Sequence, residues 1–363
     1  MRFTSRSSKT LVFGYHGKSN FGDDLFVEAM EEFGGAILNA DVVEFMRTSR
    51  PKRGSLARAW HSATSGTSRM AAPLRAAELL WKLLRARNVA FCGGSLFVRP
   101  SGAHLILYVL TRMKLCTLSA YGVSVGPIQA TGRGKAVLEY LVENCEPLIV
   151  RDRASLERLP VTASRQAAAL GGDLAALHSG ISNATSSETA SRPGDYVLFI
   201  PCSTASNNHA SAKLLANSLS GVDRVIVLSV NSNMDVGDDQ LAIDCAQLIG
   251  DSGFASTAVM YSDVQTDGAI RYIANAKFVI SARLHGAIAA YLMSVPFAIQ
   301  SYHSKCDDFA SDIGLKKERL LTSDATPATW KRAVEDLSAN LSAGTSVEPS
   351  TYKSKALSIY LHA

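Results

Sequence analysis

Three cationic or titratable side chains follow strand-like segments late in the sequence. Residues 276–281 are predicted to form a buried strand, and Arg283 and His285 come directly after it, at the start of a predicted helix. Lys305 follows the next apolar run. Backbone N–H groups at a helix start, a guanidinium and an imidazole together favour binding of an anion. A lone histidine at a helix start is more often structural, but the three side chains together favour a functional site.

A pair of acids follows the first predicted strand. The segment "NFGDD" places Asn20 and Gly22 in a turn, and Asp23 and Asp24 at the start of a helix. One interpretation is helix capping and complementation of the helix dipole, worth about 0.5–2 kcal/mol. The other is chemical, because adjacent carboxylates at a strand's carboxyl end can bind a polyhydroxyl substrate or accept a proton from a hydroxyl. The two roles are compatible.

Two further strand ends carry polar groups. "FCGGSLF" ends a strand at Gly93 and Gly94, where a backbone amide or the Ser95 hydroxyl could approach a ligand closely, although a plain turn explains the pattern almost as well. In "LIVRDRASLERL", Arg151 follows a strand directly, while Asp152 could cap the next helix. An arginine at that position is predicted to face an anion.

The tripeptide Gly17-Lys18-Ser19 invites comparison with a nucleotide phosphate loop. The pattern G-x-x-x-x-G-K-S requires glycine at position 12, where this chain has Val12, and only two residues separate Gly14 from Gly17. The sequence therefore gives little support to an NTPase.

These residues lie between regularly alternating elements. Apolar, β-branched runs predict strands, and the segments between them predict helices, which is typical of parallel sheets covered on both faces. The strands are expected within 10–15, 41–46, 88–94, 116–126, 147–153, 196–201, 223–230, 256–262, 276–283 and 295–302. The helices are expected at 22–33, 69–87, 102–114, 131–144, 208–219, 236–251, 267–275, 284–293 and 326–341.

The chain of 363 residues is long enough for two domains. The alternation breaks at "HSGISNATSSETASRPGD", which has the composition of a linker. We predict an α/β fold with two doubly wound, Rossmann-like domains and a ligand cleft between them. The expected boundaries are an N-terminal domain at 1–178, a linker at 179–194, a C-terminal domain at 195–345 and a polar tail at 346–363.

Composition excludes several classes of protein. A net charge of +5 is too mild for a dedicated nucleic-acid binder but permits an anionic small molecule as partner. The six cysteines lack metal-type spacing and are predicted to be buried free thiols. No segment approaches the roughly 20 apolar residues of a membrane span. We expect a cytoplasmic protein with no metal and no cofactor.

The predicted helix at 69–87 is basic and amphipathic. Packing of its leucines on the sheet is the commoner role for such a helix. A helix of this kind can also lie on an anionic membrane, so a peripheral contact at the inner face of the membrane stays open.

The ordered set of motifs resembles the polysaccharide pyruvyl transferase family. The resemblance covers residues 11–310 and includes a glycine turn with N-x-G-D-D, a double-glycine strand end, R-D-x-x-S and G-D before the linker. Its most specific part is "SARLHGAIAAYLMSVPFAIQSYHSK", with an R-L-H-G motif, a V-P pair and Y-x-x-K. The chain departs from the family pattern at Ser95, where the family has a third glycine. The matching positions are Asn20, Gly22, Asp23, Asp24, Gly93, Gly94, Arg151, Asp152, Ser155, Gly172, Asp173, Arg283, Leu284, His285, Gly286, Val295, Pro296, Tyr302 and Lys305.

The resemblance implies a fold similar to GT-B glycosyltransferases and a transfer of pyruvate from phosphoenolpyruvate to two hydroxyls of one sugar. It implies a sugar acceptor that is commonly lipid-linked, bound by Asn20, Asp23, Asp24, Gly94 and Ser95. It further implies that phosphoenolpyruvate is bound by Arg283, Leu284, His285, Gly286, Lys305 and Arg151. In this scheme His285 or a neighbouring acid protonates the enol carbon, and Asp23 or Asp24 accepts the hydroxyl proton.

Two alternatives stay open at this point. A GT-B glycosyltransferase would have the same fold and would use a nucleotide sugar, whose ribose Asp307 or Asp308 could bind. A non-catalytic glycan-binding subunit of a polysaccharide assembly complex is the other alternative.

Overall fold

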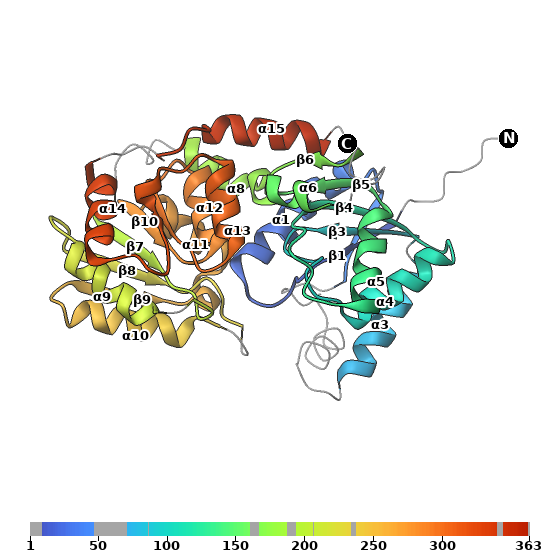
Figure 1. The fold of residues 1–363 in the computed structure, drawn as a ribbon, viewed down its shortest axis with the longest axis horizontal. Coiled ribbons are helices and arrows are strands. Elements are labelled where there is room, and N and C mark those ends of the chain that lie inside the picture. Colours follow the sequence, from blue (N-terminus) through green and yellow to red (C-terminus); the bar gives the residue numbers. More distant parts are fainter. Residues whose placement is uncertain are drawn as a thin grey trace. The chain divides into compact units, whose positions relative to one another are not determined.

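A computed structural model describes residues 9–46, 71–85, 87–159, 167–186, 194–205, 207–233, 237–339 and 344–361. The chain forms two compact units (Figure 1). Unit 1 comprises residues 1–18, 26–174 and 355–363, and unit 2 comprises residues 19–25 and 175–354.

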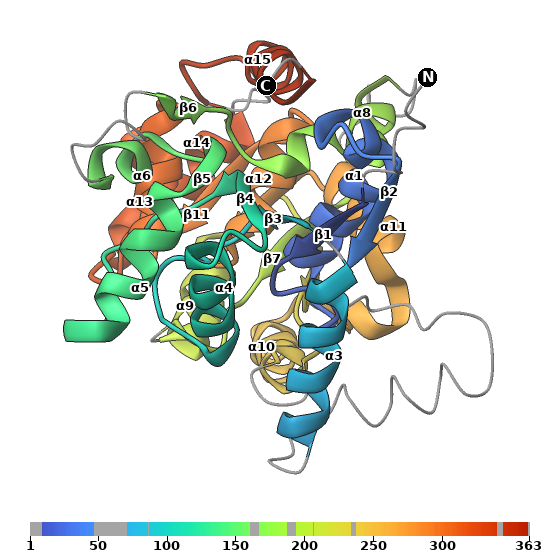
Figure 2. The same ribbon diagram turned by 90° about the vertical axis from the view of Figure 1, so that its right-hand side faces the viewer.

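Unit 1 is built on a six-stranded parallel sheet with the strand order β2-β1-β3-β4-β5-β6. Its strands are β1 (Lys9–Phe13), β2 (Val42–Phe45), β3 (Asn88–Cys92), β4 (Thr117–Val123), β5 (Cys145–Val150) and β6 (Ala169–Leu170). Its helices are α1 (Phe21–Ile37), α3 (Ala71–Arg85), α4 (Gly102–Arg112), α5 (Gly132–Glu143) and α6 (Arg153–Arg158). Helices α3, α4 and α5 form a layer in which α4 contacts both neighbours (Figure 2).

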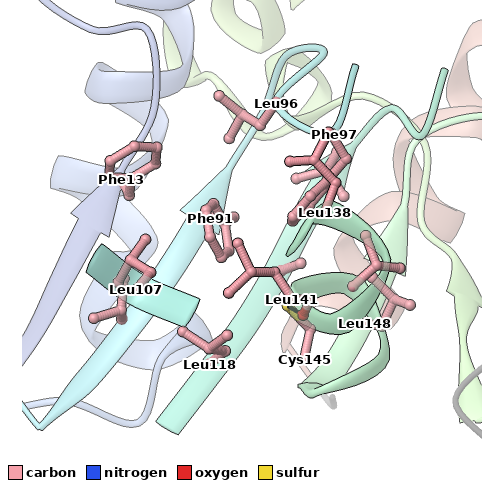
Figure 3. Close-up of a cluster of buried hydrophobic side chains, with 14 of the residues drawn as sticks. Phe13, Phe91, Leu96, Phe97, Leu107, Leu118, Leu138, Leu141, Cys145 and Leu148 are labelled. Carbon is pink, nitrogen blue, oxygen red and sulfur yellow. Dashed lines mark hydrogen bonds between the residues drawn. The ribbon is translucent and has the colours of Figure 1, made fainter. Parts of the chain in front are cut away.

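The core of unit 1 lies between the sheet and this helix layer (Figure 3). Phe91 on β3 packs against Phe13 and Phe97, with ring centroids 5.3 and 4.8 Å apart. The His104 ring of α4 stacks on Phe91 at 6.2 Å. Burial lowers the pKa of His104 to about 4, so the ring is neutral at pH 7 and packs as an aromatic group.

Unit 2 has a second six-stranded parallel sheet, with the strand order β12-β11-β10-β7-β8-β9. Its strands are β7 (Tyr196–Ile200), β8 (Arg224–Leu228), β9 (Ala255–Val259), β10 (Phe278–Ser281), β11 (Phe297–Gln300) and β12 (Leu320–Leu321). Its α-helices are α8 (Ser179–Ser186), α9 (Asn208–Ser218), α10 (Asp239–Gly250), α11 (Tyr261–Ala274), α12 (Leu284–Leu292), α13 (Ser304–Asp312) and α14 (Pro327–Ala339). The central strands β7 and β10 are buried along their whole length, as parallel strands covered on both faces must be.

Every predicted strand is present, and the predicted parallel α/β class is confirmed. The expected linker contains helix α8, and its residues 187–193 lie outside the described residues, as do residues 69, 70 and 86 of the predicted basic helix. All six cysteines are free and buried, as predicted. Among the described helices, none is long and apolar enough to cross a lipid bilayer.

The expected polar tail instead contains helix α15 (Pro349–Leu361). Its residues Ala356 and Tyr360 are fully buried, and the Tyr360 hydroxyl donates a hydrogen bond of 2.5 Å to the carbonyl of Gly172. The sequence did not predict this helix, because two buried side chains among polar residues give only a weak helical periodicity of apolar positions.

Candidate functional site

The "NFGDD" segment is held in unit 2, although the sequence suggested the N-terminal domain. Backbone hydrogen bonds attach it beyond β8: the Phe21 N–H donates to the Val230 carbonyl at 2.9 Å, and the Ser232 N–H donates to the Ser19 carbonyl at 2.9 Å. Phe21 is fully buried, with its ring 6.1 Å from that of Tyr261. These contacts place the start of α1 beside the carboxyl end of the second sheet.

Polar contacts then order the first turn of α1. The Asn20 side chain accepts a hydrogen bond from the Gly22 N–H at 3.1 Å. Asp24 is 4% exposed, and its Oδ2 accepts a hydrogen bond of 2.8 Å from the buried Tyr261 hydroxyl. Asp23 is more exposed than Asp24. Of the two adjacent acids, Asp24 is therefore fixed in the interior, while Asp23 borders solvent.

Gly22 makes room for the imidazole of His285. A Cβ atom at Gly22 would lie 1.9 Å from Nδ1 and 2.4 Å from Cγ of His285, far inside any allowed contact. The backbone of Gly22 does not have a positive φ, so conformational freedom is not the reason for glycine here. The N-terminal glycine–acid motif and the histidine of R-L-H-G thus meet, although more than half of the chain separates them.

Helix α12 begins at this point, directly after β10. Arg283 is its N-cap residue, and its N–H donates to Ser281 Oγ at 3.2 Å. A Cβ atom at Gly286 would lie 2.5 Å from Ser281 Oγ and 2.7 Å from Ile200 Cδ1. Glycine in R-L-H-G therefore lets the helix start pack closely on β10 and β7, which sets the position of the two residues before it.

The guanidinium of Arg283 is fixed by Asp238, a residue that sequence reasoning missed. Nε donates to Oδ2 at 2.7 Å and Nη2 donates to Oδ1 at 2.6 Å, in a bidentate pair. Asp238 is fully buried and also accepts from the Ser203 N–H at 2.8 Å. Burial opposes the charged form of Arg283, but the hydrogen bonds to Asp238 outweigh it and raise its pKa. In the sequence, an aspartate before α10 is indistinguishable from an ordinary helix cap.

Tyr302 lies near Arg283, and Lys305 lies over the Tyr302 ring. The Lys305 Nζ lies 5.5 Å from the centroid of the Tyr302 ring. Burial and the neighbouring Cys202 raise the pKa of Tyr302, while Arg283 acts in the opposite direction, so the phenol stays protonated at neutral pH. Asp307 accepts from Ser301 Oγ at 2.7 Å.

The candidate residues of unit 1 lie at the carboxyl ends of its own strands. Gly93 and Gly94 both have positive φ angles, of 67° and 72°, and the Ser124 N–H donates to the Gly94 carbonyl at 2.9 Å. A Cβ at Gly93 would collide with Phe26 at 2.2 Å. A tight structural turn accounts for this pair, and the role of Gly94 and Ser95 in acceptor binding stays a prediction.

Arg151 lies in a buried network of unit 1. It is 5% exposed, and its Nη1 lies 3.3 Å from Oδ2 of Asp173. Its Nε lies 3.6 Å from Oδ2 of Asp152, which also accepts from Ser124 Oγ at 2.8 Å. Two carboxylates therefore surround this guanidinium, and its expected role in binding phosphoenolpyruvate stays a prediction.

The structure thus brings together Asn20, Gly22, Asp23 and Asp24 with Arg283, Leu284, His285 and Gly286 in unit 2, which also holds Lys305, Asp307 and Asp308, and it places Gly94, Ser95 and Arg151 in unit 1. Across the described ranges, no group of three or more His, Cys, Asp or Glu side chains is arranged to hold a metal ion.

Comparison with known proteins identifies both family and fold. The sequence profile described as polysaccharide pyruvyl transferase matches residues 20–304. No curated protein sequence matches the chain.

Solved structures show the same fold at low identity. UDP-GlcNAc 2-epimerase from Methanocaldococcus jannaschii superposes with a TM-score of 0.57 at 8% identity, covering 98% of this chain and 99% of the epimerase. Sucrose-phosphate synthase from Thermosynechococcus elongatus gives 0.56 at 12% identity, with 98% and 95% covered. UDP-GlcNAc 2-epimerase from Neisseria meningitidis gives 0.52 at 8% identity, with 96% and 94% covered. These likenesses confirm the predicted GT-B type of fold.

Proposed function

Because the chain belongs to the polysaccharide pyruvyl transferase family, we propose that it transfers pyruvate from phosphoenolpyruvate to two hydroxyls of one sugar in a polysaccharide precursor, releasing phosphate. The observation that carries the proposal is the packing of Gly22 against His285. This contact brings a pair of carboxylates and an imidazole together beside a helix start. The proposed reaction needs both kinds of group, because one must give a proton to the enol ester and the other must accept a proton from a hydroxyl.

The cationic side of the site suits the donor. Phosphoenolpyruvate carries a carboxylate and a phosphate, which calls for several cations and oriented N–H groups. Arg283 presents a guanidinium held rigid by Asp238, and the start of α12 adds N–H groups and the positive end of a helix dipole. Lys305 supplies a second cation on the next helix, α13. Part of the Arg283 side chain stays accessible, at 16%, so the guanidinium can face a ligand while Asp238 holds its other edge.

The first chemical step joins the donor to the sugar. His285 gives a proton to the terminal carbon of the enol, and positive charge develops on the carbon that carries the phosphate. A sugar hydroxyl attacks that carbon, forming one C–O bond, and a carboxylate of the acid pair accepts the hydroxyl proton. Asp23 is the better placed acceptor, since it borders solvent whereas Tyr261 binds Asp24 in the interior.

The second step closes the ketal. The other hydroxyl of the same sugar attacks the same carbon, the C–O bond to phosphate breaks, and phosphate leaves with the bonding electron pair. The second hydroxyl proton returns to His285, and the carboxylate passes the proton of the first hydroxyl to the departing phosphate, which restores the starting protonation state of both groups. The scheme needs no change in oxidation state and balances with donor, sugar and protein alone.

Ligand-induced thermal stabilisation separates this function from its rivals. Stabilisation of the full chain by phosphoenolpyruvate is expected, with release of phosphate when candidate hexosides are added. UDP-GlcNAc is the ligand in the Neisseria meningitidis epimerase structure. Stabilisation by UDP-GlcNAc instead of phosphoenolpyruvate would indicate an enzyme that uses a nucleotide sugar. Stabilisation by neither would indicate a glycan-binding subunit and contradict the proposal.

Substitution of His285 tests the assignment of the acid. His285→Ala is expected to lower kcat by about 10²–10⁴-fold, the usual contribution of a general acid. The matched control is His209→Ala, because His209 is a solvent-exposed histidine of α9 with a side-chain exposure of 60%. Near-normal turnover in His285→Ala would show that another group protonates the enol.

A further inference from the structure

An exposed apolar surface covers the outer side of helices α3 and α4 in unit 1. Leu105 and Val109 on α4 and Met113, the C-cap residue of that helix, are spaced four residues apart, which puts them on one stripe, and they are 55%, 45% and 63% exposed. On α3, Trp81 and Leu84 are 54% and 70% exposed. Isolated exposed apolar residues are ordinary in proteins, but a stripe of this length on adjacent helices is not.

The two helices that carry these side chains are neighbours. Helix α3 contacts α4 within the layer that covers the sheet (Figure 2). The segments that follow the two helices are also joined, since the Thr117 N–H donates to the Arg87 carbonyl at 2.8 Å. We call Leu80, Trp81, Leu84, Leu105, Val109 and Met113 the α3–α4 surface.

Cations accompany this surface. Arg85, Arg87, Arg112 and Lys114 are exposed around it. Residues 79–88 and 102–117 contain no aspartate or glutamate. Arg85 lies over the Trp81 ring at 4.6 Å, so a cation and an aromatic ring are presented together.

Acidic side chains border the surface at one edge. Trp81 and Arg85 line a cavity of about 830 Å³, and its lining also includes four acids, namely Glu31, Glu32, Asp41 and Glu44. These acids lie on the α3 side. The apolar stripe of α4 has two charged neighbours in sequence, Arg112 and Lys114, and both are positive.

We propose that the α3–α4 surface docks onto an anionic phospholipid bilayer. Exposed leucine, methionine and tryptophan side chains can insert at the boundary between headgroups and acyl chains, while arginine and lysine pair with anionic headgroups. The surface shares no residue with the candidate site, so the inference does not depend on the proposed reaction.

Charge argues for lipid over a second copy of the chain. A symmetric dimer through the α4 stripe would bring together two copies of a patch whose neighbouring charges, Arg112 and Lys114, are both positive, and like charges facing each other disfavour association. A bilayer with anionic headgroups supplies the opposite charge and the apolar layer in one partner.

Co-sedimentation of the full chain with lipid vesicles tests the inference. Binding is expected to vesicles of equal parts phosphatidylcholine and phosphatidylglycerol, and to be weak with phosphatidylcholine alone. The double variant Leu84→Glu, Met113→Glu is expected to lower the partition coefficient by more than about twentyfold, because each of its two added negative charges contributes about fivefold. The matched control is Ile243→Glu in unit 2, which changes an apolar side chain of 44% exposure outside the surface.

A second variant tests the cations by themselves. Arg112→Gln with Lys114→Gln removes two charges next to the α4 stripe and should weaken binding by about twentyfold, with a similar loss for the wild type at high salt. Thermal unfolding of each variant checks that the fold persists. Equal binding to neutral vesicles, no binding at all, or an equal loss in Ile243→Glu would overturn the inference. So would a change of oligomeric state in the Glu double variant with unchanged vesicle binding, since a second copy would then occupy the surface.

Discussion

Replacing Gly22 by alanine should remove activity with little loss of stability. The new Cβ would lie 1.9 Å from His285 Nδ1, whereas ordinary contacts begin at 3.4 Å, so the imidazole must move by 1.5 Å, the difference between these distances. A displacement of about 1 Å at a reacting group can cost about 10²-fold in rate. We therefore expect kcat to fall by at least about 10²-fold.

The stability of the same variant follows from two opposing effects. Alanine is favoured over glycine in a helix by up to about 1 kcal/mol. Overpacking of a buried site costs about 1–3 kcal/mol. The free energy of unfolding should therefore fall by at most about 2 kcal/mol, which is measurable by chemical denaturation and leaves the protein folded.

A double-mutant cycle with His285→Ala identifies the mechanism of the loss. If the methyl group added by Gly22→Ala acts through the imidazole alone, adding this substitution to His285→Ala should lower phosphate release from phosphoenolpyruvate no further. Gly35→Ala in the same helix is the matched control, because its Cβ would meet only the Ala40 carbonyl at 3.4 Å. Additive losses in the double variant, or full activity in Gly22→Ala, would refute the reasoning.

Three further experiments test other parts of the structure. Tyr261→Phe removes the hydroxyl that donates to Asp24 at 2.8 Å and should lower the free energy of unfolding by about 1–3 kcal/mol, measured by denaturation with urea. Asp238→Ala leaves a largely buried guanidinium without its carboxylate and should cost about 3–5 kcal/mol while weakening the thermal shift produced by phosphoenolpyruvate. Burial lowers the pKa of both His16 and His104 from 6.5 to about 4, so the unfolded chain binds more protons between these values. Stability should therefore fall as the pH drops from 6.5 to 4, by up to about 3 kcal/mol for each histidine, and replacing both by glutamine should flatten that dependence.

The strands were predictable because their signal is strong and local. The residues of β7, β8 and β10 are apolar almost without interruption, as buried parallel strands must be, and polar turns bound them. Helix α15 was not predictable, since beyond its first residue only two of its side chains, those of Ala356 and Tyr360, are buried. A period of that kind cannot be distinguished from a polar tail until the partner surface is known.

The site residues were predictable as separate motifs, but not their grouping. The glycine–acid turn and the R-L-H-G segment each have recognisable residue types. Their meeting depends on the backbone pairing of Phe21 with Val230 and on the close approach of Gly22 to His285. Neither contact has a local signal, because both join segments that are distant in sequence. Tyr261 was missed for the same reason, since a tyrosine after a strand carries no mark of the carboxylate that it binds.

The two arginines predicted to bind an anion have different charged neighbours. Both Arg151 and Arg283 follow a strand directly, so the sequence suggested the same role for each. Arg151 is 5% exposed and lies within ion-pair distance of two carboxylates, those of Asp152 and Asp173. An incoming phosphate at that position would lie beside these two carboxylates and would have to displace buried partners, at a cost typical of a broken buried ion pair.

Arg283 differs from Arg151 in its charged neighbours. It pairs with the single carboxylate of Asp238, and the start of α12 adds partial positive charge beside it. Its guanidinium binds Asp238 through Nε and Nη2, in the bidentate fork that fixes its orientation without a second acid. The same residue type at the same kind of strand end therefore has two carboxylates beside it in unit 1 and one in unit 2, and the binding of phosphoenolpyruvate by each stays a prediction.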